Sequence, residues 1–367
     1  MRQTNFFSVI RKIKWLTAVI LFLIFSAIQL FAKPELQFKG EIDFTFSHVL
    51  FHSELPDFKK NLRLVNTILD LDIKDIINKD TPFDAFVSYQ LRALDSLSTN
   101  KSGIQIEPYR YWFRYFRENY ELRLGMQKLV FGHARVLRPL ALFDSIDPTD
   151  YTKKTSGQKA FRLKYFPRKN LELHGWTIHN DENSEKYHYG GRINRVFGNG
   201  EIAATFQHWN REQNTKVNED IWGFDLFLDI EVGFWIEHAS HLYENIKDLH
   251  LTTTGIDYTF PGIGNGLHVG IEHLLQSSGN RYKMESQTTS IFWDIPLTDE
   301  TTFFGIYFYE NSMQTQALNL RLMQDLSDNL NGALSINWVN KNLGELTTPG
   351  NLLPFQKDIS IRLVYSF

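Results

Sequence analysis

The sequence predicts an all-β chain that closes into a transmembrane antiparallel β-barrel of about 18 strands, or 16 as the alternative, with one long loop folded inward. Three observations predict this class: an N-terminal segment typical of exported proteins, alternating segments of about ten residues, and connections that alternate in length. Aromatic residues are abundant, with 30 Phe, 15 Tyr and 8 Trp among 367 residues. Tilted strands of about ten residues are long enough to cross a bilayer.

The first 32 residues differ from the rest in charge and hydropathy. Basic residues between Arg2 and Lys14 precede an apolar run from Trp15 to Phe31, and Ala32 follows it. This layout is typical of a secretory signal peptide, so we predict export and cleavage after Ala32. An uncleaved N-terminal anchor is the alternative that the length of the run leaves open. No later run is long enough for a membrane helix, so we expect residues 33–367 to form a single barrel.

Alternation with a period of two predicts each strand in turn. The expected strands span 35–51, 60–73, 82–94, 103–117, 120–131, 158–166, 170–179, 186–197, 200–209, 220–229, 231–242, 249–260, 266–275, 285–295, 300–309, 314–325, 329–340 and 356–367. Connections after even-numbered strands are short and rich in Gly, Pro, Asn and Asp, whereas those after odd-numbered strands are longer and polar. Short periplasmic turns and longer external loops are typical of outer-membrane barrels, and a soluble sandwich has no reason to show this asymmetry.

The same alternation predicts which residues meet lipid. In the last segment the apolar side chains share one face, with Ile361, Leu363 and Tyr365 among them. We assign the lipid face in the same way to Trp222, Phe224, Leu226 and Leu228, and to Phe304, Ile306 and Phe308. Aromatic residues near the strand ends indicate girdles at the two membrane interfaces.

Residues 132–157 form the longest polar insertion, between the well-patterned segments 120–131 and 158–166. A connection of this length is usually functional when it is not disordered. We therefore expect this loop to fold into the lumen and to narrow it. It brings three aspartates with it: Asp144, Asp147 and Asp150.

If the apolar faces meet lipid, basic residues on the strands around this loop face the lumen. They are Arg92, Arg110, Arg114, Arg123, Arg162 and Lys164. Neighbouring antiparallel strands place residues of one face close together, so we expect a ladder of cations on one wall, offset by the three aspartates of the loop. Acids on later strands would make the opposite wall negative: Asp225, Asp229, Glu237, Asp257 and Glu272. Such charges set selectivity in a narrow pore, or simply solvate a wet lumen.

Two stretches resemble known families. The final residues, ISIRLVYSF, which end at Phe367, resemble the terminal strand by which the barrel-assembly machinery recognises bacterial outer-membrane proteins. LRLGMQKLVFGHAR, from Leu122 to Arg135, resembles the G-R-Q-x-x-x-[WY]-G strand of the alginate-export-like porins, with Met126 and Phe131 departing from that pattern. The resemblance implies a large porin in the outer membrane, with lipid, a small polar solute and the assembly machinery as partners.

We expect passive diffusion of small polar or anionic solutes, such as sugars or sugar acids, because planar guanidinium groups pair well with carboxylates. We expect no enzyme activity, no metal site and no cofactor, since the chain lacks cysteine and shows no zinc-ligand spacing. The acidic balance argues against a nucleic-acid partner. The oligomeric state stays open.

Two other functions are alternatives: a lipid hydrolase of the outer membrane, and a non-conducting surface or scaffold barrel. His238 and Ser240 are two positions apart, on the face that we assign to lipid near the external end. They are similar to the His-x-Ser pair of outer-membrane phospholipases, in which the imidazole activates the hydroxyl. His241 and Leu242 replace the Asn-Gly that follows the serine in that family.

Overall fold

The computed structural model describes most of the chain. The described residues are 35–51, 61–76, 82–96, 102–144, 154–155, 157–179, 187–210, 218–244, 246–279, 283–312, 314–340 and 357–367. The predicted signal peptide lies outside them. Within them, no helix is long and apolar enough to cross a membrane.

Eighteen β-strands make up the described part of the chain. They are β1 (Glu35–Phe51), β2 (Asn61–Lys74), β3 (Phe83–Ser96), β4 (Ser102–Arg117), β5 (Tyr120–Gln127), β6 (Gln158–Arg168), β7 (Leu171–His179), β8 (Tyr187–Phe197), β9 (Gly200–Trp209), β10 (Glu219–Ile230), β11 (Val232–Tyr243), β12 (Leu249–Phe260), β13 (Leu267–Ser278), β14 (Lys283–Pro296), β15 (Thr301–Glu310), β16 (Thr315–Ser327), β17 (Leu330–Asn340) and β18 (Lys357–Ser366).

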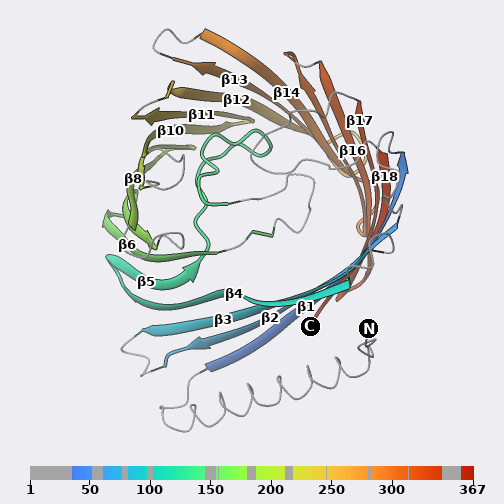
Figure 1. Cartoon of the computed structure of the whole chain (residues 1–367), viewed down its shortest axis with the longest axis horizontal. Helices are drawn as coiled ribbons and strands as arrows, with labels where there is room; N and C mark the ends of the chain where they lie inside the picture. Colours follow the sequence, from blue (N-terminus) through green and yellow to red (C-terminus); the bar gives the residue numbers. More distant parts are fainter. Residues whose placement is uncertain are drawn as a thin grey trace.

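The strands form one closed antiparallel barrel. Each pairs with its neighbours in sequence, and β1 also pairs with β18, with Glu41 opposite Ser366 and Ser47 opposite Ser360. Figure 1 looks into the barrel and shows the ring of strands from blue β1 to red β18. The predicted fold class and the count of 18 strands are confirmed, and the alternative of 16 is wrong.

The faces of most strands follow the predicted alternation. On β18, Ile361 is 53% exposed and Leu363 is 40% exposed on the outer face. Val364, which faces inward, is 5% exposed. On β10, Trp222 is 57% exposed on the outer face, and Asp225 on the inner face is fully buried. A polar or covered interior and an apolar exterior are what a barrel surrounded by lipid requires.

Residues 128–144, the first described part of the connection between β5 and β6, lie inside the barrel. Figure 1 shows this part, in teal, within the ring of strands. β5 ends at Gln127, so the prediction of a strand up to Phe131 is wrong, and the inward segment begins at residue 128. Gln127 is fully buried and donates a side-chain hydrogen bond to the carbonyl oxygen of Ala160 on β6 at 3.0 Å. We call residues 128–144 the inward segment.

The inward segment is held on the lumen wall by two apolar clusters. Its residues Leu129, Phe131, Leu140 and Phe143 pack in one cluster with inner residues of β6 to β11. Ala134 and Leu137 pack in a second cluster with inner residues of β11, β14 and β15: Trp235, Phe292, Ile306 and Phe308. Burial of this apolar surface favours a segment that is packed on the wall over one that moves freely in the lumen.

The second cluster corrects the predicted orientation of β15. Ile306 and Phe308 are 1% and 8% exposed and face inward, not toward lipid, and Phe304 packs against the same cluster. The reason is that Ala134 and Leu137 of the inward segment cover them, so the inner face of this strand is as apolar as the outer face. Alternation cannot separate two apolar faces.

Candidate functional site

Glu272 of β13 binds the backbone of the inward segment. Its fully buried carboxylate accepts hydrogen bonds from three consecutive amides, those of Arg135 at 2.6 Å, Val136 at 3.0 Å and Leu137 at 2.7 Å. The indole Nε1 of Trp235 donates a fourth at 3.1 Å. A buried carboxylate is costly unless such donors satisfy it, so this carboxylate and these amides depend on one another.

Glu237 of β11 holds the same segment at a second point. Its fully buried carboxylate accepts the amide hydrogen of Ala134 at 2.6 Å, and that of Leu140 at 3.4 Å. The preceding Gly132 has a φ of +84°, and a Cβ there would lie 2.0 Å from Oε1 of Glu237. Only glycine allows both this backbone conformation and the close approach of the carboxylate.

Side chains of the inward segment add ion pairs with the same wall. Arg135 contacts Asp257 of β12 at 2.6 Å. The imidazole of His133 stacks on Phe227 with 4.8 Å between ring centroids, and its Nε2 lies 3.4 Å from Glu201. Of the acids that we expected on a negative wall, Glu237, Glu272 and Asp257 therefore hold the inward segment, and do not face an open lumen.

His133, Glu201 and Asp225 bring three potential metal ligands together, with ligand atoms within 4.8 Å of one another. This cluster was not predicted from the sequence. Arg192 of β8, however, contacts both carboxylate oxygens of Asp225, at 2.6 and 2.8 Å. The cluster is thus an ion-pair network in which the guanidinium neutralises Asp225, which leaves this carboxylate a poor ligand for a cation.

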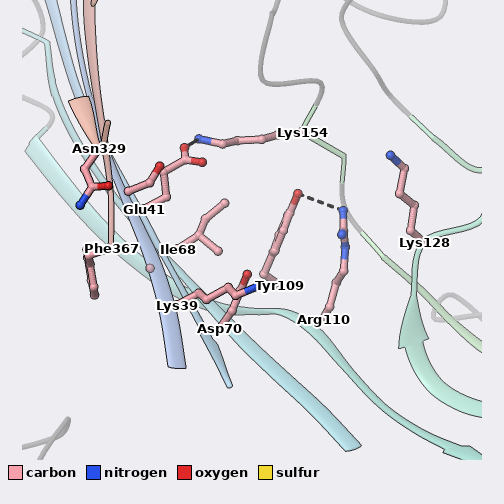
Figure 2. A pocket seen from close by; sticks show the side chains of 12 residues that line it. Lys39, Glu41, Ile68, Asp70, Tyr109, Arg110, Lys128, Lys154, Asn329 and Phe367 are labelled. Atoms are coloured by element: carbon pink, nitrogen blue, oxygen red, sulfur yellow. Dashed lines mark hydrogen bonds and ion pairs between the residues drawn. The ribbon is translucent and has the colours of Figure 1, made fainter. Parts of the chain in front are cut away.

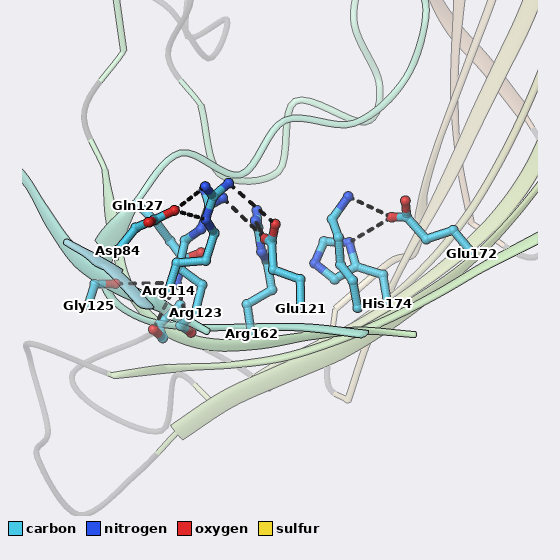
Figure 3. Close-up of polar contacts among 11 residues, drawn as sticks. Asp84, Arg114, Glu121, Arg123, Gly125, Gln127, Arg162, Glu172 and His174 are labelled. Atoms are coloured by element: carbon cyan, nitrogen blue, oxygen red, sulfur yellow. Dashed lines mark hydrogen bonds and ion pairs between the residues drawn. The ribbon is translucent and has the colours of Figure 1, made fainter. Parts of the chain in front are cut away.

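Three of the predicted basic residues form a row across adjacent strands. Arg114 of β4 lies opposite Arg123 of β5, which lies opposite Arg162 of β6. Figure 3 shows the three side chains on the inner side of the wall, and with them the carboxylates that pair with them. The expected ladder is present as a cross-strand arrangement.

Carboxylates of neighbouring strands offset this row. Glu121 of β5 contacts all three guanidinium groups, at 3.9 Å for Arg114, 3.1 Å for Arg123 and 2.5 Å for Arg162. Asp84 of β3 accepts a hydrogen bond from Nε of Arg114 at 3.1 Å. Two carboxylates, Glu121 and Asp84, for three guanidinium groups leave the row with a net positive charge.

The aspartates of the loop do not supply these partners where the structure describes them. Asp144 pairs with Arg138 of its own segment, with 3.0 Å between Nη2 and Oδ2, so the expectation that it faces the arginine row is wrong. Asp147 and Asp150 lie outside the described residues. Arg138 lies only six residues from Asp144 in the sequence, so the pair forms within the segment itself.

The other predicted basic residues lie apart from the row. Lys164 of β6 pairs with Glu172 of β7 at 2.8 Å. Arg110 of β4 donates to the carbonyl oxygen of Thr155 at 2.8 Å, and so contacts the far part of the long connection. Arg92 of β3 is exposed.

A pocket of about 600 Å³ lies on the lumen side of β1, β2 and β4 (Figure 2). Cations and carboxylates both line it: Lys39, Arg110, Lys128 and Lys154, with Glu41 and Asp70. Tyr109 and Ile68 add apolar surface between them, and Lys154 contacts Glu41 and Asp43 of β1. The inward segment packs on the opposite half of the barrel, from β6 to β15, so this pocket lies beside the uncovered half.

No family model and no curated protein matches the chain. Among solved structures, OprD of Pseudomonas aeruginosa matches with a TM-score of 0.62 at 9% identity, over 91% of this chain and 94% of that chain. OccK5 (OpdH) of the same organism matches with a TM-score of 0.59 at 11% identity, over 91% and 97%. A variant of Rh. blastica porin matches with a TM-score of 0.54 at 8% identity, over 91% and 100%.

At these identities the matches show a common barrel fold. The resemblance to alginate-export-like porins is not confirmed by them. Sequence reasoning placed Glu237 and Glu272 on the inner wall but missed what they bind. Gly132 is the residue from which the contact with Glu237 could have been predicted. A glycine at such a position indicates a backbone that passes close to another group.

Proposed function

We propose that this barrel is an outer-membrane porin through which small polar or anionic solutes diffuse passively. Support comes from the closed barrel of 18 strands, which is similar to a solved porin, and from a segment fixed across part of its interior. A fixed segment narrows the lumen without closing it, and the passage then takes its selectivity from size and from the charges beside it. Location in the outer membrane belongs to the same proposal.

The preference for anionic solutes is inferred from the row of Arg114, Arg123 and Arg162, which share the carboxylate of Glu121. A net positive wall attracts anions, and the planar guanidinium pairs with carboxylate groups in two parallel hydrogen bonds. Sugar acids and other small carboxylates fit this chemistry, and hydroxylated solutes fit the mixture of donors and acceptors in the pocket of Figure 2.

The partners of the chain follow from its outer wall and its last strand. We infer that lipid surrounds the exposed apolar side chains, and that the assembly machinery recognises the strand that ends at Phe367. The backbone of Phe367 pairs with Gly40 of β1 in both directions, at 2.8 and 2.9 Å, so the last residue belongs to the seam that closes the barrel.

Single-channel recording in a planar bilayer tests the porin. The reversal potential under a salt gradient is compared between the wild type and the variant Arg123→Ser, which removes the central cation of the row. We expect steady conductance in both, and a shift of preference toward cations in the variant. Arg195→Ser is the matched control, because it removes the same charge from the outer face of β8, which Arg195 shares with the exposed Ile193.

Two results would count against the proposal. A folded wild type that conducts nothing would reject the porin and favour a scaffold barrel. Equal reversal potentials in the wild type and the Arg123→Ser variant would keep the channel and reject the arginine row as its selectivity element.

A further inference from the structure

A polar cluster lies on the outer face of β11 and β12, away from the lumen. Glu237 and Ala239 of β11 are fully buried on the inner face. His238 and Ser240 alternate with them and therefore face outward, as predicted from the sequence. His250 of β12 lies opposite Ser240, and Thr252 lies opposite His238. The cluster is close to the end of β11 that leads into the connection 244–248. Neither the barrel closure nor the passage of solutes uses it.

The four side chains form one hydrogen-bonded chain. Nε2 of His238 lies 2.8 Å from Oγ of Ser240, and Nδ1 of His250 lies 2.9 Å from the same oxygen. Nδ1 of His238 lies 2.8 Å from Oγ1 of Thr252. Ser240 therefore sits between two imidazoles, and the ring of His238 is oriented by a hydroxyl on the adjacent strand.

Two arrangements of the protons place the hydroxyl proton of Ser240 within this chain. The single hydroxyl proton of Ser240 goes to one imidazole, and Oγ then accepts the N–H of the other. In either arrangement one histidine is a base for the hydroxyl, and the second is a hydrogen-bond donor beside Oγ. An activated serine needs two such groups. One accepts its proton, and the other donates a hydrogen bond near the ester oxygen on which negative charge develops.

Polar side chains that only contact lipid headgroups have no need to share one hydroxyl in this way. Ionisable groups on the membrane-facing wall are costly, and they mark functional sites more often than residues elsewhere do. Ser240 is half-buried on the outer face, the side on which we infer that lipid surrounds the barrel.

We propose that Ser240, His238 and His250 form an acyl-ester hydrolase site on the outer wall of the barrel, and that its substrate is an acyl ester of a membrane lipid. Oγ of Ser240 attacks the ester carbonyl carbon, and its proton passes to the accepting imidazole. The ester C–O bond breaks, and that imidazole returns the proton to the leaving alkoxide. Water then cleaves the acyl-serine with the same imidazole as base, which releases the fatty acid and restores the hydroxyl.

The test uses the full-length barrel, folded in detergent, and an alkyl fluorophosphonate as the probe. Attack by Oγ forms an O–P bond and expels fluoride, so mass spectrometry identifies the labelled residue. We expect label on Ser240 in the wild type, none at this position in Ser240→Ala, and a labelling rate about 100-fold lower in His238→Asn/His250→Asn. Thr254→Ala, which removes an outward hydroxyl from the same face of β12, should label like the wild type.

A second measurement follows the release of fatty acid from vesicles of phosphatidylethanolamine and phosphatidylglycerol, which we expect from the wild type and not from Ser240→Ala. Conductance is recorded on the same preparations. Equal conductance in the two proteins would show that loss of hydrolysis is independent of the pore. The proposal is overturned if Ser240 takes no label in a folded, conducting barrel, or if it takes label but no fatty acid is released.

Discussion

The carboxylate of Glu272 accepts the amide hydrogen of Arg135 at 2.6 Å, across 137 positions of the chain. This hydrogen bond is one of several by which the buried carboxylates of Glu237 and Glu272 hold the backbone of the inward segment. An acid on the inner wall of a barrel need not face the passage, because it can instead fix the shape of that passage.

Glu272→Gln should loosen the inward segment. Glutamine keeps the volume but presents an NH₂ group to backbone amides that are themselves donors, and a buried donor without an acceptor costs about 1–3 kcal/mol. We expect larger and noisier single-channel conductance, while the barrel still migrates as a folded species before heating. Glu300→Gln, in the exposed turn between β14 and β15, is the control. Wild-type traces from Glu272→Gln would mean that this carboxylate does not position the segment.

Gly132→Ala should have a similar effect by a different route. The φ of +84° costs a residue with a Cβ about 1–2 kcal/mol, and that Cβ would lie 2.0 Å from the carboxylate of Glu237. We expect displacement of the segment and higher conductance noise. Gly175→Ala is the matched control, since a Cβ there would meet no atom within 4 Å. Indistinguishable traces from the two alanine variants would contradict this explanation.

Glu121→Gln should make the pore more selective for anions. This carboxylate contacts Arg114, Arg123 and Arg162, and its removal leaves their charges without the partner that they share. The reversal potential under a salt gradient should move further toward the anion value, and the change should be smaller at high salt because of screening. Glu231→Gln, in the turn after β10, should leave it unchanged. A shift toward cations would show that the row does not border the passage.

Gly40→Leu should weaken the closure of the barrel. A Cβ on Gly40 would lie 2.2 Å from the ring of Phe367, so the ring must leave its place on the seam between β1 and β18. We expect the folded band on a gel to disappear at a lower temperature. Gly103→Leu, where a Cβ would meet nothing within 4 Å, is the control, and equal melting of the two variants would refute the prediction.

The sequence predicted the strands well because a strand in lipid repeats every two residues, and this period can be read locally. The last strand illustrates this, with Ile361 and Leu363 outside and Val364 inside. The prediction failed at Ile306 and Phe308, where the inner face is also apolar. It failed again at Asp144, whose partner is Arg138 and not the arginine row.

The sequence by itself therefore determined the barrel, its number of strands, the positions of its cations on one wall, and the presence of a long insertion. Only the tertiary structure decided that Glu237 and Glu272 bind the insertion, and that Glu121 and Asp84 offset the arginines. The physical reason is distance along the chain. Alternation reports on the face of each residue, but which side chains meet inside a barrel depends on the register of many strands and on where the inward segment packs.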